Sequence, residues 1–222
     1  MESRTILIDE VPTEIRLMGE DYIIGEDPAE VGVEYAIKCW PGKHVPGKWP
    51  NRPIAAYFRK IMKAYGASAI TAWQGKTLVG FLPFMPINCG MPQMLFCVVA
   101  SEDEQTPIEL INAAEPIPFE QLSPKVLKVQ CASVAWQKNM YRKGIGSAMA
   151  RYLVDWAREA GWERIEGWAF ANPEENDAYV WIPSVQFWEK AGMQREQSRV
   201  FDPSDPITSK PGYDFAIDLQ QK

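Results

Sequence analysis

A glycine loop between a predicted strand and a predicted helix constrains the fold of this chain more than any other feature. Residues 126–136, VLKVQCASVAW, are rich in β-branched and small apolar side chains, which is typical of a buried central strand. Between residues 147 and 160, apolar side chains recur at the helical period, and Gly161 is placed to end the helix. Residues 164–170, RIEGWAF, predict the next strand. This order predicts a βαβ unit inside an α/β or α+β layered structure.

Further elements are predicted on both sides of this unit. The patterns indicate helices at 28–40, 52–65 and 185–191, a hairpin over 68–84 with its turn at Gln74-Gly75-Lys76, and late strands near 199–201 and 213–219. Between about residues 86 and 124 the pattern breaks down around prolines and an acidic cluster, and only the apolar run at 94–100 predicts a strand. We interpret this stretch as an insertion. A length of 222 residues fits one elaborated domain, or a domain with an appendage.

Composition excludes several classes of partner. With 29 acidic against 23 basic residues and a formal charge of -6, the chain lacks the broad positive field that nucleic-acid binding requires. The first residues, MESRTILIDEVP, carry acids where a signal peptide would be basic, and no later apolar run is long enough to span a membrane. We therefore expect a cytoplasmic protein with no nucleic-acid or membrane partner.

The cysteines and the single histidine predict no metal site. Cys39, Cys89, Cys97 and Cys131 form no CxxC pair, so neither a zinc-ligand set nor a disulfide framework is indicated. The histidine, His44, lies in the loop GKHVPGKWPNRP, and the chain has no GxSxG nucleophile motif. We interpret the cysteines as reduced thiols and His44 as a surface-loop residue.

The glycine loop itself, YRKGIGSAM at residues 141–149, has the character of an anion site. A loop that leads into a helix presents unpaired backbone N–H groups at the positive end of the helix dipole, which suits a phosphate or pyrophosphate. Gly144 and Gly146 would let phosphate oxygens approach the backbone, and Arg142 and Lys143 add positive charge at the rim. The loop matches neither GxxxxGK[ST] nor GxGxxG. On this stretch alone, a tight structural turn with incidental glycines is an equal alternative.

A longer stretch resembles a known family. The run SVAWQKNMYRKGIGSAMARYLVDWAREAGWERIEGWAF, followed by VQFWEKAGM at 185–193, resembles the core of the GNAT superfamily of acyl-CoA-dependent N-acyltransferases. The resemblance covers about residues 125–200, and the hairpin strand VGFLPF is similar to an early strand of the family. It implies one domain over 1–222 with an elaborated N-terminal part at 1–66. The implied fold is a mixed, largely antiparallel sheet flanked by helices, with two central strands that splay apart.

The resemblance also implies a binding site for acetyl-CoA. The pantetheine arm would lie along the strand before the loop, bonded by the backbone of Val134, Ala135 and Trp136. The pyrophosphate would lie on the loop, whose predicted binding residues are Tyr141, Arg142, Lys143, Gly144, Ile145, Gly146 and Ser147. Asn172, just past the strand across the cleft, and Trp188 complete the predicted set. No metal is implied.

The chain departs from the family pattern at the residues expected to move protons. Trp188 stands where many members have a tyrosine acid, and Gln130 falls roughly where some have a glutamate base; neither side chain can do that work at neutral pH. Glu166, in a strand predicted to be buried, is a candidate base, with a surface-facing salt bridge as the alternative. Ser184 is a candidate proton donor, with a packing or capping role as the alternative.

The sequence therefore predicts an N-acyltransferase that moves an acetyl or other acyl group from acetyl-CoA to a primary amine of a small molecule or peptide by direct attack. The departures at Trp188 and Gln130 support one rival, a non-catalytic module that binds or senses acyl-CoA. A second rival is an unrelated α/β protein whose glycine turn is structural. A homodimer is a mild expectation, because many relatives pair through late strands or inserted segments.

Overall fold

The computed structural model describes the chain in seven segments: residues 2–19, 52–92, 105–129, 131–134, 142–172, 183–200 and 210–220. The helices are α4 (Arg52–Tyr65), α5 (Gln105–Ala113), the short 3-10 helix η1 (Phe119–Gln121), α6 (Ile145–Glu159) and α8 (Val185–Lys190). The strands are β1 (Arg4–Ile8), β2 (Val11–Leu17), β3 (Ala69–Gln74), β4 (Thr77–Pro86), β5 (Val126–Val129), β6 (Ser133–Val134), β7 (Arg164–Phe170), β8 (Gln194–Val200) and β9 (Pro211–Asp218). The predicted helix at 28–40 and strand at 94–100 lie outside the described residues.

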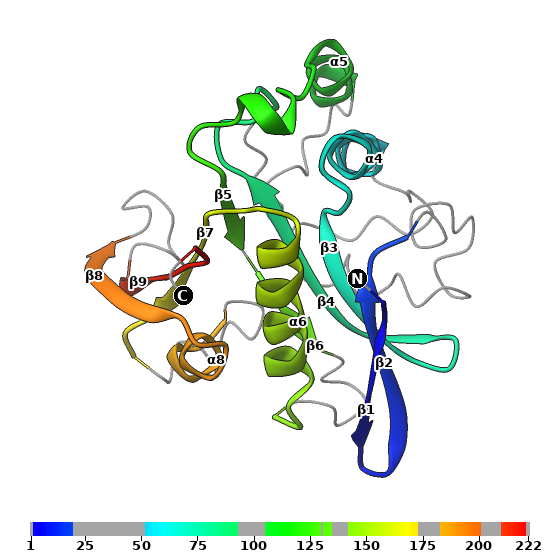
Figure 1. Ribbon diagram of the computed structural model, residues 1–222, viewed down its shortest axis with the longest axis vertical. Coiled ribbons are helices and arrows are strands. Elements are labelled where there is room, and N and C mark those ends of the chain that lie inside the picture. Colours follow the sequence, from blue (N-terminus) through cyan, green and yellow to red (C-terminus); the bar gives the residue numbers. More distant parts are fainter. Residues whose placement is uncertain are drawn as a thin grey trace.

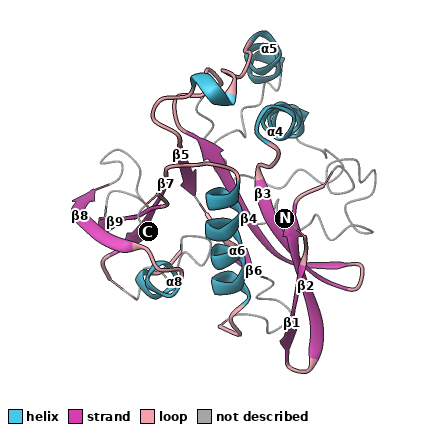
Figure 2. Ribbon diagram, viewed as in Figure 1, coloured by secondary structure: helices cyan, strands magenta, loops and turns pink. Residues whose placement is uncertain are grey.

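One mixed sheet runs through the molecule (Figure 1). It has nine strands: eight follow one another in the order β1-β2-β3-β4-β5-β7-β9-β8, and the ninth, β6, pairs with β4 beside that path. Every pairing is antiparallel except that of β5 with β7, which the α6 crossover joins in parallel. Figure 2 shows α6 lying across the strands. The predicted fold class, a layered α/β arrangement with a largely antiparallel sheet, is confirmed.

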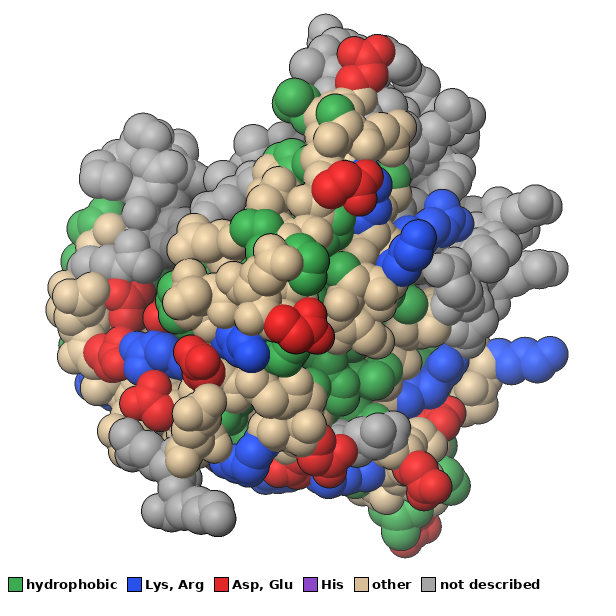
Figure 3. All heavy atoms as spheres, turned by 45° about the horizontal axis from the view of Figure 1, so that its top comes forward, with side chains coloured by type: hydrophobic (Ala, Val, Ile, Leu, Met, Phe, Trp, Pro, Cys, Tyr) green, Lys and Arg blue, Asp and Glu red, His purple; other side chains and the backbone are tan. Residues whose placement is uncertain are grey.

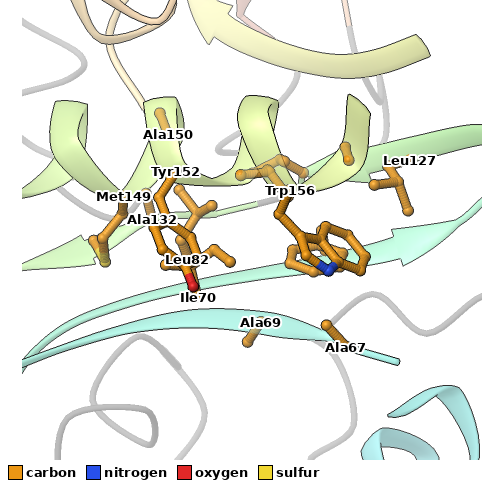
Figure 4. Packing of buried hydrophobic residues seen from close by; sticks show 14 of the residues in the cluster. Ala67, Ala69, Ile70, Leu82, Leu127, Ala132, Met149, Ala150, Tyr152 and Trp156 are labelled. Carbon is orange, nitrogen blue, oxygen red and sulfur yellow. The ribbon is translucent and has the colours of Figure 1, made fainter. Parts of the chain in front are cut away.

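Helices cover both faces of this sheet. On one face α6 lies so close to β4 that a Cβ atom at Gly80 would stand 2.9 Å from the sulfur of Met149. Figure 4 shows Met149 and Trp156 directed from α6 toward the strands. On the other face, Phe58 of α4 meets Phe81 of β4 edge to face, with ring centroids 6.1 Å apart. Because neighbouring residues of a strand point to opposite faces, the two helices are on opposite sides of β4.

Most of the predicted elements are confirmed. The helix at 52–65 is α4, the hairpin turns between Gln74 and Thr77, and the predicted βαβ unit is β5–α6–β7. The helix predicted from residue 147 begins two residues earlier, at Ile145, because the chain enters it through Gly144. The late strand predicted near 199–201 is longer and starts at Gln194.

The prediction of one continuous central strand over 126–136 is wrong. The chain forms β5, leaves the ladder, and pairs again with β4 only at Ser133 and Val134. The partners of β4 change from Phe84↔Val129 to Phe81↔Ser133, so Pro83 lies opposite the interruption. Proline has no N–H to donate to a sheet ladder, which accounts for the break at this point.

The region predicted as an irregular insertion contains a helix, α5, which the sequence pattern did not indicate. The ammonium of Lys60 on α4 donates to the carbonyl oxygens of Asn112 and Ala114 and pairs with Glu115 at 3.1 Å. A lysine at this position supplies donors to carbonyl groups at the C-terminal end of α5, which have no partner inside the helix. The short α5 is therefore fixed by a contact with α4.

The sequence pattern also predicts no strand before residue 28, whereas β1 and β2 form a hairpin at the edge of the sheet. This hairpin is attached to α6. The guanidinium of Arg4 lies 2.7 Å from the Asp155 carboxylate and 5.6 Å from the centre of the Tyr152 ring. The hydroxyl of Tyr152 donates to the carbonyl oxygen of Glu2 at 3.0 Å. The N-terminal segment is thus tied to the helix that follows the glycine loop.

Candidate functional site

Two central strands part next to the glycine loop. β5 and β7 pair in parallel from Val126↔Arg164 to Lys128↔Glu166. Beyond this point the described strands separate, because β6 pairs with β4 through Gly80↔Val134 while β7 continues along β9. The predicted splay of the central strands is therefore present, and Val134 lies on the strand that borders it.

Helix α6 begins at this opening with an exposed N-terminus. Gly144 is the N-cap residue in a left-handed conformation, at φ 92° and ψ -2°. The first bond of the helical ladder runs from the N–H of Ala148 to the carbonyl of Gly144 at 2.9 Å, so the N–H groups of Ile145, Gly146 and Ser147 have no partner within the helix. Among the described residues, no side chain caps this end.

The space around Gly144 suits an anion. A Cβ atom built at this residue would meet nothing within 4 Å, so the backbone is approachable from outside. The positive φ favours glycine, since other L-residues rarely adopt it. N–H groups without a partner inside the helix, at the positive end of a helix dipole and bordered by open space, fit a phosphate group. The loop therefore has the geometry expected of the predicted phosphate site.

Two cations border the loop. Arg142 and Lys143 are both exposed, and Arg142 has a positive φ of 62° although it is not glycine. The ammonium of Lys143 forms an ion pair with the carboxylate of Asp9, which lies in the turn between β1 and β2. The sequence alone gave no reason to join residues 134 positions apart, so Asp9 is a neighbour of the loop that only the structure reveals.

Gly146 has a packing role that the sequence did not indicate. A Cβ atom at this position would stand 3.1 Å from the ring of Phe187 on α8 and 3.8 Å from a methyl group of Val134. The missing side chain therefore lets α8 and β6 approach the first turn of α6. The interpretation that both glycines leave room for phosphate fits Gly144, whereas the space beside Gly146 is filled by protein.

Trp188, predicted to bind the cofactor, is a core residue. This residue is 1% exposed, and its indole N–H donates to the carbonyl of Trp168 at 3.0 Å. The ring lies against Gly167, where a Cβ atom would be only 2.4 Å away. A buried indole whose donor is already bonded has nothing to offer a ligand. We therefore correct the prediction and leave Trp188 out of the candidate site.

Glu166, the candidate base, is not buried as predicted. Its side chain is 38% exposed, and its carboxylate accepts a hydrogen bond from Arg164 at 3.0 Å. Arg164 also pairs with Glu196 and Asp218, so three carboxylates surround one guanidinium. Along β7, Glu166 and Gly167 point to opposite faces, and Gly167 is the one that contacts α8. This arrangement is the surface salt bridge that the sequence allowed as the alternative.

The remaining predicted residues fall in different places. The hydroxyl oxygen of Ser184 accepts from the N–H of Phe187 at 3.2 Å and so caps α8, as the alternative interpretation held. A role as proton donor stays a prediction. Asn172 is exposed just past the end of β7. Ala135, Trp136, Tyr141 and Gln130, together with His44, lie outside the described residues.

The described part of the chain contains no group of three or more His, Cys, Asp or Glu side chains that could hold a metal ion. In the same residues, no helix has the length and apolar character needed to cross a bilayer. On the face drawn in Figure 3, acidic and basic side chains are interleaved over the described residues.

Fold and site together define a protein with an uncapped helix N-terminus at the splay of a mixed sheet. The family model of the acetyltransferase (GNAT) family matches residues 34–193, which is more than half of the chain. The chain therefore belongs to the GNAT acetyltransferase family. Comparison with curated protein sequences gives no match.

Several solved structures share the fold. The ribosomal-protein-S5-alanine acetyltransferase from Vibrio fischeri has a TM-score of 0.58 and 12% identity, covering 100% of this chain and 98% of its own. The Salmonella typhimurium protein yncA, solved with its cofactor acetyl-CoA, has a TM-score of 0.55 and 11% identity, with 95% of each chain covered. The GNAT-like decarboxylase GphF, in complex with isobutyryl-CoA, has a TM-score of 0.54 and 13% identity, covering 93% of this chain and 99% of its own. At these identities the likeness concerns the fold.

Proposed function

We propose that this protein is an N-acyltransferase that moves an acetyl or other acyl group from acetyl-CoA to a primary amine of a small molecule or peptide. One observation carries the proposal: the uncapped first turn of α6, entered through Gly144, opens beside the strand that carries Val134. A phosphate-binding N-terminus next to a gap between strands suits a ligand with a pyrophosphate at one end and a narrow arm at the other. Acetyl-CoA has this shape.

The chain's own residues would bind and orient the reactants. The N–H groups of residues 145–147 would hold the pyrophosphate, Arg142 and Lys143 would balance its charge, and the edge of β6 would bond the pantetheine arm. Acyl transfer from a thioester by direct attack needs a neutral amine, a fixed carbonyl and a donor for the developing oxyanion. A thiol is a good leaving group, so a strong acid is not essential. The proposal therefore needs no acid at Trp188, whose indole is bonded inside the core.

A second candidate function is a non-catalytic module that binds acyl-CoA. Two observations favour it: the Trp188 indole is bonded inside the core, and the Glu166 carboxylate is paired with Arg164. The structure of GphF shows that a GNAT-like protein described as a decarboxylase also holds an acyl-CoA, so the fold alone does not specify acyl transfer. The two candidates share the site and differ in whether the thioester is cleaved.

Titration calorimetry with acetyl-CoA and with free CoA tests the shared site first. We expect micromolar binding of both. A ligand present at one hundred times its dissociation constant should also stabilise the fold by about 2.7 kcal/mol. Absence of both effects would contradict the proposal.

A panel of amines, assayed by the release of free thiol, then separates the two candidates. An acyltransferase releases CoA faster with at least one amine than without any. Tight binding with no release above background across small-molecule and peptide amines would favour the binding module.

A further inference from the structure

The turn of the N-terminal hairpin places a negative charge on the cationic rim of the glycine loop. Asp9 pairs with Lys143, one of the two cations that border the N-terminus of α6. The side chains are 61% and 32% exposed, so the pair lies at the surface, where a ligand can reach the ammonium. A carboxylate here neutralises a cation that a phosphate would otherwise use.

The backbone of the turn fixes where this carboxylate lies. Ile8 pairs with Val11, so Asp9 and Glu10 form a two-residue hairpin loop, and both have positive φ, at 50° and 66°. Such loops favour asparagine, aspartate and glycine, and a glutamate is an uncommon occupant. In this conformation Asp9 forms its ion pair with Lys143.

The rest of the hairpin keeps the turn in place. Arg4 is bound to Asp155, and the Tyr152 hydroxyl to the Glu2 carbonyl, so the other end of β1 is attached two to three helical turns further along α6. The hairpin is therefore attached to α6 at one end and, through its turn, to the residue just before the N-cap of α6 at the other. Of these contacts, the ion pair between Asp9 and Lys143 is the one that a ligand of the glycine loop would disturb.

We infer that Asp9 is a positioning residue that sets the affinity of the loop for coenzyme A by holding Lys143 in the free protein and releasing it to phosphate. The inference rests on the proposed function, since it requires the loop to bind a phosphate of CoA. On binding, the partner of Lys143 changes from the Asp9 carboxylate to a phosphate. Because the carboxylate competes with the phosphate, Asp9 lowers the affinity of the site.

Calorimetric titration of CoA into four variants tests this inference. Asp9→Asn removes the charge and keeps a residue that tolerates positive φ, so the turn should be retained. Glu10→Gln is the matched control, because it removes the same charge from the same turn without touching the pair. Lys143→Met and the double variant Asp9→Asn/Lys143→Met complete a double-mutant cycle.

We expect Asp9→Asn to bind CoA about two- to fivefold more tightly than the wild type, the range expected when an exposed ion pair no longer has to be broken. Glu10→Gln should bind nearly as the wild type does. In the Lys143→Met background, Asp9→Asn should have no further effect, which a general loss of stability in the turn would not produce.

Three outcomes would overturn the inference while leaving the proposed function intact. They are unchanged or weaker binding by Asp9→Asn, an equal gain in Glu10→Gln, and a gain that persists when Lys143 is methionine. If wild-type protein binds no CoA, the proposed function fails and the inference fails with it, so the two failures are distinguishable.

Discussion

Single residues in this chain combine chemical roles with packing roles that their type does not reveal. Glu166 has the carboxylate of a general base but shares the guanidinium of Arg164 with Glu196 and Asp218. Trp188 occupies a motif position, yet its indole is bonded to the Trp168 carbonyl. At this scale the partner of a side chain decides what it can do.

Glu166→Gln should leave turnover close to that of the wild type. Its carboxylate is half-exposed and ion-paired with Arg164, so its loss should change the stability of the sheet surface slightly and leave catalysis unaffected. Loss of a true general base would instead lower turnover by about 100-fold or more. Steady-state kinetics with the best amine of the panel measures the difference.

Glu196→Gln is the matched control, since it removes another carboxylate from the same guanidinium. A large fall in turnover confined to Glu166→Gln, with CoA affinity unchanged, would establish Glu166 as the base after all.

Among the elements, α8 contacts the first turn of α6, where the candidate site lies. Phe187 on α8 lies against Gly146 in the first turn of α6, and Trp188 next to it lies against Gly167 of β7. The N–H of Ala191 closes α8 by bonding the Phe187 carbonyl at 3.2 Å. The short helix α8 therefore supports the turn that we expect to hold the pyrophosphate.

Gly146→Val should destabilise the protein by overpacking this contact. A Cβ atom alone would already stand 3.1 Å from the Phe187 ring, and two further methyl groups require the ring to move. Overpacking of this kind costs about 1–3 kcal/mol. For a chain of this size, each kcal/mol lowers the melting temperature by about 2–4 °C. Thermal unfolding of the purified variant measures the loss.

Phe187→Ala provides the corresponding control because it removes the ring. Gly146→Val should cost less in that background than in the wild type. An equal cost in both backgrounds would show that the glycine is required for a reason other than the contact with Phe187.

For the molecule as a whole, the face of β4 that carries α4 buries a cluster of titratable groups. Burial raises the pKa of the Tyr57 and Tyr65 hydroxyls, and the nearby Cys89 thiol raises both further. Burial also raises the pKa of Cys89, an effect that a hydrogen bond with the backbone of Met91 partly offsets. The Tyr65 hydroxyl donates to the Ile117 carbonyl at 2.7 Å, which joins α4 to the segment after α5.

The free energy of unfolding should therefore fall as the pH rises above about 8.5, the ordinary pKa of a free thiol. In this window the folded chain keeps the proton of Cys89 and the unfolded chain loses it, so unfolding releases protons and is favoured by higher pH. Urea unfolding between pH 8 and pH 10 measures the slope.

Cys89→Ala should flatten the first part of this decline, because the thiol no longer titrates on unfolding. A wild-type stability that is unchanged across the range, or a slope identical in the variant, would contradict the prediction.

The sequence by itself determined the elements whose pattern is local. The apolar period of α6, the turn at Gly75, the strand RIEGWAF and the glycine loop could all be predicted, because each depends on residues close together in the chain. Those elements, in that order, were also enough to indicate the family that the comparisons show.

Only the tertiary structure decided what each of these elements contacts. Pro83 of β4 lies opposite the break between β5 and β6, and Phe187 fills the space beside Gly146. Asp9, in the turn of the first hairpin, forms an ion pair with Lys143. Each of these pairs joins residues far apart in the chain, and residue spacing carries no information about such contacts. The sequence thus determined where the glycine loop would form, and the packing of distant segments decided which side chains remain available to it.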